Sequence, residues 1–415
     1  MATSPDPVFS SAMTSLATPV RRDSLVIGLI GAAHFMSHFF QLALAPIFPL
    51  LKDEFDVSWT ALGGITAVFY AVSGICQALV GVWCDRYGAA RVLYMGLALL
   101  ALSIAAAGLV PYFWMLYPLA ALAGMGNSVF HPADLSILST RVSQGRLGRA
   151  YSVHGLSGTL GYATSPVVIG TMAFTVGWRP ALVIAGVVGL VALALISRFD
   201  EALGGAGTHT GTARDDHRYG ALIRQPGIVS GFVFFALAAI AGIGFQSFGV
   251  PALISIHQVP LAVATTALTV YLLAQASGIF AGGWIVVWTS RHDLVALAGM
   301  GLAAVAMAIA GAATLPFTVV LALIAFSGFS AGTVGPARDM LIRAAAPEGA
   351  TGKVFGFVYS GLDIGSCAGP IAFGWLMDHD SPRLVFAAIA ITLALTMPMV
   401  ITVRRNAKPV SAPAD

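Results

Sequence analysis

Charged side chains are scarce in this sequence. Asp, Glu, Lys and Arg together make up 9% of its 415 residues, whereas 58% are hydrophobic. A soluble domain carries about 25% charged residues, so this composition excludes a disordered chain, a coiled coil and almost any soluble enzyme of this length. The apolar residues recur in long runs along nearly the whole chain. We therefore expect a polytopic integral membrane protein.

Cysteine is also rare, and several catalytic signals are absent. The three cysteines, Cys76, Cys84 and Cys367, form no CxxC pair, so neither a disulfide framework nor a thiolate metal site is indicated. No GxxxxGK[ST] loop is present, so ATP-driven transport by this chain is not supported. Residues 328–332 match G-x-S-x-G inside an apolar run, where the strand–turn–helix context of a nucleophile is lacking. We expect no enzyme activity, no cofactor and no nucleic-acid partner.

The apolar runs predict transmembrane helices, because about 20 apolar residues cross a bilayer. Twelve runs are found, near 25–51, 59–83, 92–110, 114–140, 147–172, 180–198, 227–256, 262–289, 294–313, 317–342, 351–377 and 383–403. They divide the chain into a tail (1–24), a six-helix bundle (25–199), a polar linker (200–225), a second six-helix bundle (226–403) and a second tail (404–415).

Lys and Arg are distributed unevenly between the two sides of the membrane. With the N-terminus inside, most of them fall on cytosolic segments, which is the bias that sets orientation in membrane proteins. The first apolar run, 25–51, is too long for a signal-peptide core. We therefore expect a retained N-terminal tail and two cytosolic termini, in a multi-pass protein of a bacterial-type inner membrane.

The two halves of the chain repeat each other. Gly124 and Gly328 lie 204 residues apart, as do Pro132 and Pro336. Two parallel six-helix halves with a binding site between them are typical of secondary transporters. The predicted fold is therefore all-α, with two pseudo-symmetric six-helix bundles. A non-transporting membrane scaffold built from duplicated halves stays an alternative.

Residues 81–91 carry a recognisable loop pattern, Gly-Val-Trp-Cys-Asp-Arg-Tyr-Gly-Ala-Ala-Arg. It resembles the G-x-x-x-D-R-x-G-R-R loop of the major facilitator superfamily, with Ala90 in place of one basic residue. The resemblance implies the major facilitator fold, in which spans one, four, seven and ten line a central cavity. It also implies that this loop latches the cytosolic side, a role that falls on Gly81, Asp85, Arg86, Gly88 and Arg91.

Parts of spans one, four and five are similar to the fosmidomycin-resistance branch of that superfamily. The similar segments are Ala33-His34 with Gln41, residues 47–55, residues 126–132 and residues 145–148. Members of the branch carry an Asn-Asp pair near His38 and an acid directly after the His-Pro pair. This chain has Ala133 and then Asp134 at that place, so its substrate and proton carrier can differ from those of the branch.

Polar and ionisable side chains inside the apolar runs are costly in a membrane and are usually functional. Helical spacing places His34, His38 and Gln41 on one face of the first span. It places Asn127, His131 and Asp134 on one face of the fourth. The remaining residues that we assign to a substrate and proton pathway are His154, Gln246, Arg338 and Asp363.

Asp134 and Arg338 occupy equivalent positions in the repeat. We expect them to attract each other across the cytosolic half when the carrier opens outward, and to separate when it opens inward. Alternatively, Arg338 binds an anionic substrate directly and Asp134 is a proton site. Asp339 and Arg343, at i and i+4, predict a salt bridge.

Histidine titrates near neutral pH, so His34, His131 and His154, together with Asp134, are candidates for coupling proton entry to export. Each histidine can instead simply hydrogen-bond a neighbouring helix. His34 and His38 have a spacing that allows metal ligation, but no acid or thiolate lies near them in the sequence. We therefore predict no metal site.

These features predict a secondary active transporter. It would export a small organic solute or drug, anionic ones included, by alternating access against proton influx. An importer or exchanger of organic anions or metal chelates stays an alternative, and a non-transporting receptor or membrane enzyme is a more distant one. The expected partners are the small-molecule substrate and the lipid bilayer, the proton gradient is the expected energy source, and we expect a monomer.

Overall fold

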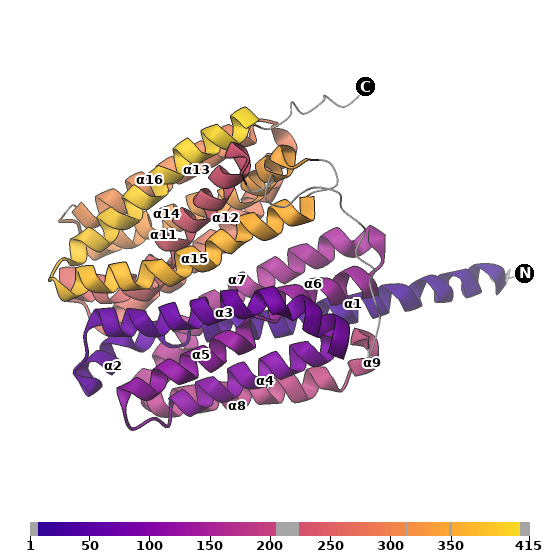
Figure 1. Ribbon diagram of the computed structural model, residues 1–415, viewed down its shortest axis with the longest axis horizontal. Helices are drawn as coiled ribbons and strands as arrows, with labels where there is room; N and C mark the ends of the chain where they lie inside the picture. Colours follow the sequence, from indigo (N-terminus) through magenta and orange to yellow (C-terminus); the bar gives the residue numbers. More distant parts are fainter. Residues whose placement is uncertain (1–6, 205–223, 313, 348–350, 407–415) are drawn as a thin grey trace, which may run out of the picture.

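The computed structural model describes residues 7–204, 224–312, 314–347 and 351–406, and within them it contains helices and no strand (Figure 1). The N-terminal half comprises α1 (Pro7–Gln41), the 3-10 helix η1 (Ala45–Ile47), α2 (Phe48–Phe55), α3 (Trp59–Tyr87), α4 (Ala89–Ala107), the 3-10 helix η2 (Phe113–Met115), α5 (Leu116–Asn127), α6 (Phe130–Arg141), α7 (Gln144–Thr175), α8 (Trp178–Ser197) and α9 (Asp200–Leu203). The C-terminal half comprises α11 (Pro226–His257), α12 (Leu261–Trp288), α13 (His292–Ala312), α14 (Phe317–Ala345), α15 (Thr351–Asp378) and α16 (Pro382–Asn406).

Every predicted span coincides with a helix or with an interrupted helix. The fourth span is divided at Ser128 and Val129 into α5 and α6, and the first ends at Gln41 and continues as η1 and α2. Helix α1 starts at Pro7, so the segment predicted as a tail is largely helical. Most of the predicted linker, residues 205–223, lies outside the described residues.

Nine helices in the described part of the chain are long and apolar enough to cross a membrane. Helices α5, α6, α7 and α15 are not among the nine. Helices α5 and α6 are too short because of the interruption between them, since about 20 residues are needed. The membrane class of the fold is therefore confirmed, and a count of twelve crossings stays a prediction.

The repeat seen in the sequence corresponds to a repeated helix contact. A Cβ atom on Gly124 of α5 would overlap the carbonyl oxygen of Phe69 on α3. In the second half, a Cβ atom on Gly328 of α14 would overlap the carbonyl oxygen of Tyr271 on α12. Glycine lets two membrane helices approach to backbone contact. The two glycines therefore fix the same close approach in each bundle.

The two bundles meet mainly where α3 packs against α15, a contact that we call the seam (residues 59–74 and 363–378). Gly63 packs against the Pro370 backbone, and Gly374 packs against the backbone of Trp59. In Figure 1, α3 and α15 run together near α2 and diverge toward the end of the molecule from which the N-terminal part of α1 projects. The bundles are therefore joined at one end and parted at the other.

A carboxylate from one bundle caps a helix of the other at the joined end. Asp378 accepts hydrogen bonds from the backbone N–H of Trp59 at 2.6 Å and of Thr60 at 2.8 Å, and from the Thr60 hydroxyl. The first N–H groups of a helix have no partner within the helix and carry positive partial charge. Asp378 thus closes the seam by satisfying the N-terminus of α3.

Candidate functional site

A cavity of about 400 Å³ lies between the bundles, beyond the point where the seam ends at Gly74 and Asp363. Seven of the residues predicted for the pathway line it: His38, Gln41, Asn127, His131, Gln246, Arg338 and Asp363. The other three, His34, Asp134 and His154, are buried behind this lining in the N-terminal bundle. The structure therefore places seven of the ten residues on the cavity wall and three behind it, and their role in a pathway stays a prediction.

Hydrogen bonds fix the amides on the N-terminal wall. The Ser37 hydroxyl donates to Oδ1 of Asn127 at 2.9 Å, and Nδ2 of Asn127 donates to the Ser73 hydroxyl at 3.0 Å. Nε2 of Gln41 donates to Ser37 at 3.2 Å, while the Tyr162 hydroxyl donates to Oε1 of Gln41 at 2.6 Å. Four helices are thereby linked, which holds Gln41 and Asn127 in one orientation.

Sequence reasoning missed the hydroxyl groups of this network. Ser37 lies four residues before Gln41 on the same face of α1, a spacing that could have singled it out. Ser73 and Tyr162 carry no comparable signal, since serine and tyrosine are common in membrane helices and their partners are distant in the sequence.

Asp134 is enclosed by two histidines from other helices. Its Oδ2 atom lies 3.2 Å from Nδ1 of His34 on α1 and 3.1 Å from Nε2 of His154 on α7. The exposed fraction of Asp134 is 0%, and that of His34 is 2%. A carboxylate in a membrane interior needs partners. His154 hydrogen-bonds Oδ2 of Asp134, and the His34 nitrogen lies close to the same oxygen without a hydrogen bond.

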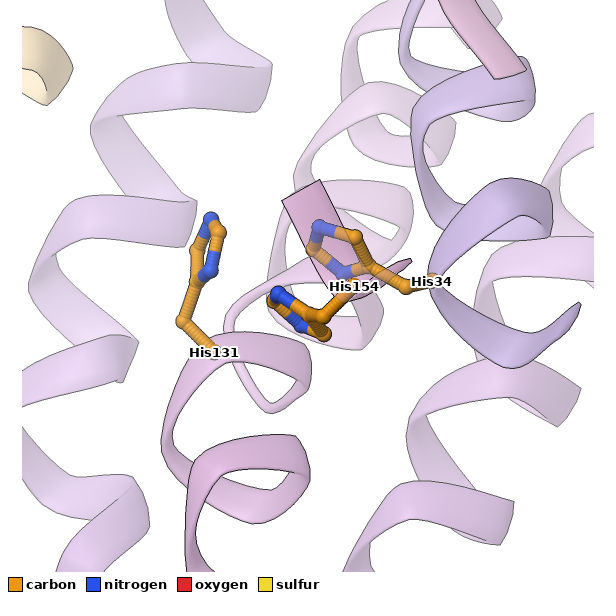
Figure 2. A group of neighbouring side chains, drawn as sticks. All are labelled: His34, His131 and His154. Atoms are coloured by element: carbon orange, nitrogen blue, oxygen red, sulfur yellow. The ribbon is translucent and has the colours of Figure 1, made fainter. Parts of the chain in front are cut away.

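Two further histidines surround this group. The His34 ring stacks on His154 with 3.6 Å between centroids, and it lies 4.4 Å from His38 and 5.1 Å from His131. Figure 2 shows the rings of His34, His131 and His154 gathered in one place. Gly158 makes room for His34 and His38, because a Cβ there would lie 2.9 Å from the His34 ring and 3.1 Å from the His38 ring.

Arg338 belongs to the opposite wall and is engaged within its own bundle. Its Nε atom lies 2.9 Å from Oδ1 of Asp339, and its guanidinium group lies 4.1 Å from the centre of the Phe235 ring. The salt bridge predicted between Asp339 and Arg343 is therefore wrong, since Asp339 pairs with its sequence neighbour. Arg343 instead is exposed at the end of α14.

The predicted pair of Asp134 and Arg338 is not formed in this conformation. Asp134 is held by His34 and His154, while Arg338 faces the cavity from the other bundle. Because the pair is expected only when the parted end closes, it stays a prediction for that other state.

The predicted cytosolic latch lies at the parted end of the bundles. Gly88 joins α3 to α4 with a φ of 88°, a backbone conformation that favours glycine. Arg86 and Arg91 are exposed beside it. Gly81 and Asp85 belong to α3, but their side-chain surroundings lie outside the described part of the structure. The latch role of the loop stays a prediction.

The cap on α3 leads to a testable expectation. Replacing Asp378 by Asn should remove the negative charge and one acceptor, which weakens the cap by about 1.5–3 kcal/mol, the contribution of a hydrogen bond to a charged group. We expect faster hydrogen exchange at the amides of Trp59 and Thr60, measured by mass spectrometry. Asp380→Asn is the matched control, because Asp380 is exposed. Unchanged exchange in Asp378→Asn would show that this contact does not hold the seam.

Comparison with known proteins agrees with this geometry. The family model described as Major Facilitator Superfamily matches residues 30–250 and 228–415. The chain is 27% identical to the fosmidomycin resistance protein of Escherichia coli (strain K12), over 96% of this chain and 97% of that protein. It is 31% identical to the tetracenomycin C resistance and export protein of Streptomyces glaucescens, over 33% of this chain and 25% of that protein.

A solved structure shares the fold. A bacterial homolog of the human lysosomal transporter Spinster, in an inward-facing and occupied conformation, superposes with a TM-score of 0.80. The alignment covers 94% of this chain and 99% of that one at 15% identity. The resemblance found in the loop of residues 81–91 and in spans one, four and five is thereby confirmed. The chain belongs to the Major Facilitator Superfamily of multi-pass membrane transporters.

Proposed function

We propose that this transporter exports a small organic anion from the cytosol in exchange for protons. The observation that carries the proposal is the cavity between the bundles, which contains one cationic and one acidic side chain and is closed at one end by the seam. Alternating access requires this arrangement, in which one binding site is closed toward a single side of the membrane at a time.

The cavity wall favours an amphipathic anion. Among the lining residues that the structure describes, Arg338 is the only Lys or Arg. Aromatic rings of Tyr70, Tyr162 and Tyr271 and amides of Gln246 and Gln275 complete the wall. An Arg forms charge-assisted hydrogen bonds with a carboxylate, sulfonate or phosphonate group, while the rings cover an apolar body.

Removal of this cation should weaken substrate binding selectively. Arg338→Gln should lower the affinity for an aromatic carboxylate or phosphonate about tenfold or more, since hydrogen bonds to charged groups contribute about 1.5–3 kcal/mol. Binding is measured by the shift in thermal unfolding temperature with ligand concentration. Arg343→Gln, on the same helix but exposed at its end, should bind as the unmodified protein does. Equal affinity in both variants would place the anion elsewhere.

Asp363 is the residue to which we assign the transported proton. It lines the cavity, and its Cβ atom would lie 3.0 Å from a Cβ at Gly74, where the seam ends. No ion pair joins it to any side chain that the structure describes. Acidic groups without a cation in the membrane interior are typical of proton pathways. Asp134, by contrast, is enclosed by two histidines away from the cavity.

Other observations support the proposed direction of transport and the proposed location. Lys and Arg gather at the parted end of the bundles, at Arg86, Arg91 and Arg343 among others. By the positive-inside rule this end faces the cytosol, so the cavity is in contact with the cytosol in this state. Two relatives are named for resistance to a drug. Export across a bacterial inner membrane, with both termini cytosolic, accords with these observations.

The proposal is tested in two steps with the full-length protein. A panel of aromatic carboxylates, phosphonates and metal chelates is first screened for thermal stabilisation of the purified chain. Compounds that stabilise it are then tested for flux in proteoliposomes with an acidic lumen, where proton antiport predicts uptake of the compound. Stabilisation by anions followed by uptake supports the proposal. Uptake only with an acidic exterior, or no flux of any stabilising compound, contradicts it.

A further inference from the structure

We propose that His34, His131 and His154, together with Asp134, form a binding site for a divalent transition-metal ion. Each histidine can offer one ring nitrogen, and these three nitrogens lie within 4.8 Å of one another (Figure 2). The residues come from α1, α6 and α7, so the group exists only in the folded bundle. The inference does not depend on the direction of transport or on its coupling ion.

The spacing of the ligand atoms is close to that of a zinc site. Zn–N and Zn–O bonds are about 2.0–2.1 Å in proteins, so neighbouring ligand atoms in a tetrahedral site lie about 3.3 Å apart. Oδ2 of Asp134 is already 3.2 Å from Nδ1 of His34 and 3.1 Å from Nε2 of His154. The three histidine nitrogens lie within 4.8 Å of one another and Asp134 is outside that set, so the histidine rings, that of His131 above all, have to move closer to complete a four-ligand site.

Two polar atoms of the group are left unsatisfied, although His154 hydrogen-bonds Asp134. Nδ1 of His34 and Oδ1 of Asp134 are buried and have no hydrogen-bond partner among the residues that the structure describes. The His34 nitrogen is near Asp134, but its N–H direction does not give a hydrogen bond to the carboxylate. Unpaired buried polar groups are costly. A bound cation would satisfy both atoms.

The chemistry and the access route select the class of ion. Imidazole ligands suit Zn²⁺, Co²⁺ and Ni²⁺, whereas Mg²⁺ and Ca²⁺ prefer sites made only of oxygen atoms. Asp134 supplies a carboxylate beside the three imidazole rings. His131 is exposed and lines the central cavity, so an ion can reach the buried pair of His34 and His154 from there.

The site differs from what the sequence suggested. In the sequence, His34 and His38 have the spacing that allows metal ligation, and no acidic residue lies near them. The structure instead groups His34 with histidines that are 97 and 120 residues further along the chain, at positions 131 and 154. It also places the carboxylate of Asp134 against two of them.

The test uses the purified full-length chain with a tag that lacks histidine. Titration with CoCl₂ should give the visible absorption of tetrahedral Co²⁺ at a stoichiometry of one ion per chain, and ZnCl₂ should abolish that absorption by competition. His154→Asn should remove the tetrahedral spectrum. Asp134→Asn removes the carboxylate ligand and should weaken Co²⁺ binding by more than about 10–100-fold, the effect of losing even an outer-shell partner of a metal site.

Two controls make the result independent of folding. His379→Asn changes an exposed histidine at the far end of the C-terminal bundle and should bind Co²⁺ as the unmodified chain does. His38→Asn changes a ring next to His34 that is outside the proposed set and should retain the tetrahedral spectrum. Absence of tetrahedral absorption in the unmodified chain overturns the proposal. So does an unchanged spectrum in His154→Asn, or loss of the spectrum in the His379 variant.

Discussion

Replacing Gly63 by Ala should prevent the seam from closing. A Cβ atom at this position would overlap the carbonyl oxygen of Pro370 and would lie 3.3 Å from the Phe248 ring. Because the overlapping atom belongs to the backbone, the overlap can be relieved only if α3 and α15 separate. A packing conflict of this kind costs about 1–3 kcal/mol, which corresponds to a loss of the closed state of about 5–150-fold.

Distances between spin labels measure this effect directly. Labels at the exposed residues Asp53 and His379 lie on opposite bundles near the joined end, so Gly63→Ala should shift their distance distribution to longer values. Transport should fall with the population of the closed state. The control is Gly28→Ala, where an added Cβ meets no atom of the described residues within 4 Å. If Gly63→Ala gave the distance distribution of the unmodified protein, the seam would tolerate the added carbon atom. Closure of the seam would then not control access to the cavity.

Replacing Asp363 by Asn should abolish transport driven by a pH gradient and preserve exchange of substrate for substrate. Asparagine keeps the size of the side chain but holds no transferable proton. The cavity and its cation at Arg338 stay in place, so binding and alternating access should continue without proton coupling. We expect pH-driven uptake at the level of protein-free liposomes, while labelled substrate still exchanges with unlabelled substrate.

The control for this variant is Asp53→Asn, which changes an exposed carboxylate of α2 outside the cavity. It should retain pH-driven uptake. If Asp363→Asn also retained it, the proton would be carried by another group, with Asp134 and its two histidines as the remaining acidic site. Loss of both uptake and exchange would instead indicate that Asp363 is needed for binding or for the conformational change.

Much of this fold could be predicted from the sequence, because a membrane restricts the chain to long apolar helices. The interruption between α5 and α6 was missed, because residues 114–140 were interpreted as one span although Asn127, Ser128 and Pro132 lie at the break. The helical start at Pro7 was also missed, because Ser, Thr and Pro are frequent there and a helix outside the membrane needs no apolar run.

For the candidate site, too, one part could be predicted from the sequence and another part could not. Intramembrane polar residues such as Gln41 and Arg338 were found because their cost in a membrane is high. Their partners were not found: Arg338 pairs with its sequence neighbour Asp339, and His34 meets Asp134 across 100 residues of sequence. Asp378 could not be singled out from the sequence, because an acidic residue at the end of a predicted span is usually just part of a loop. Its cap on α3 depends on how the bundles meet.

The exchange of protons for substrate is tested most directly by the pH inside proteoliposomes. A permanently charged aromatic sulfonate or phosphonate that binds the protein is added outside, and the luminal pH is followed with a trapped fluorescent dye. The account predicts that the lumen becomes more alkaline as substrate enters, in either orientation of the protein. It also predicts no such change with Asp363→Asn. Acidification of the lumen, or substrate entry without any change in pH, would contradict proton antiport.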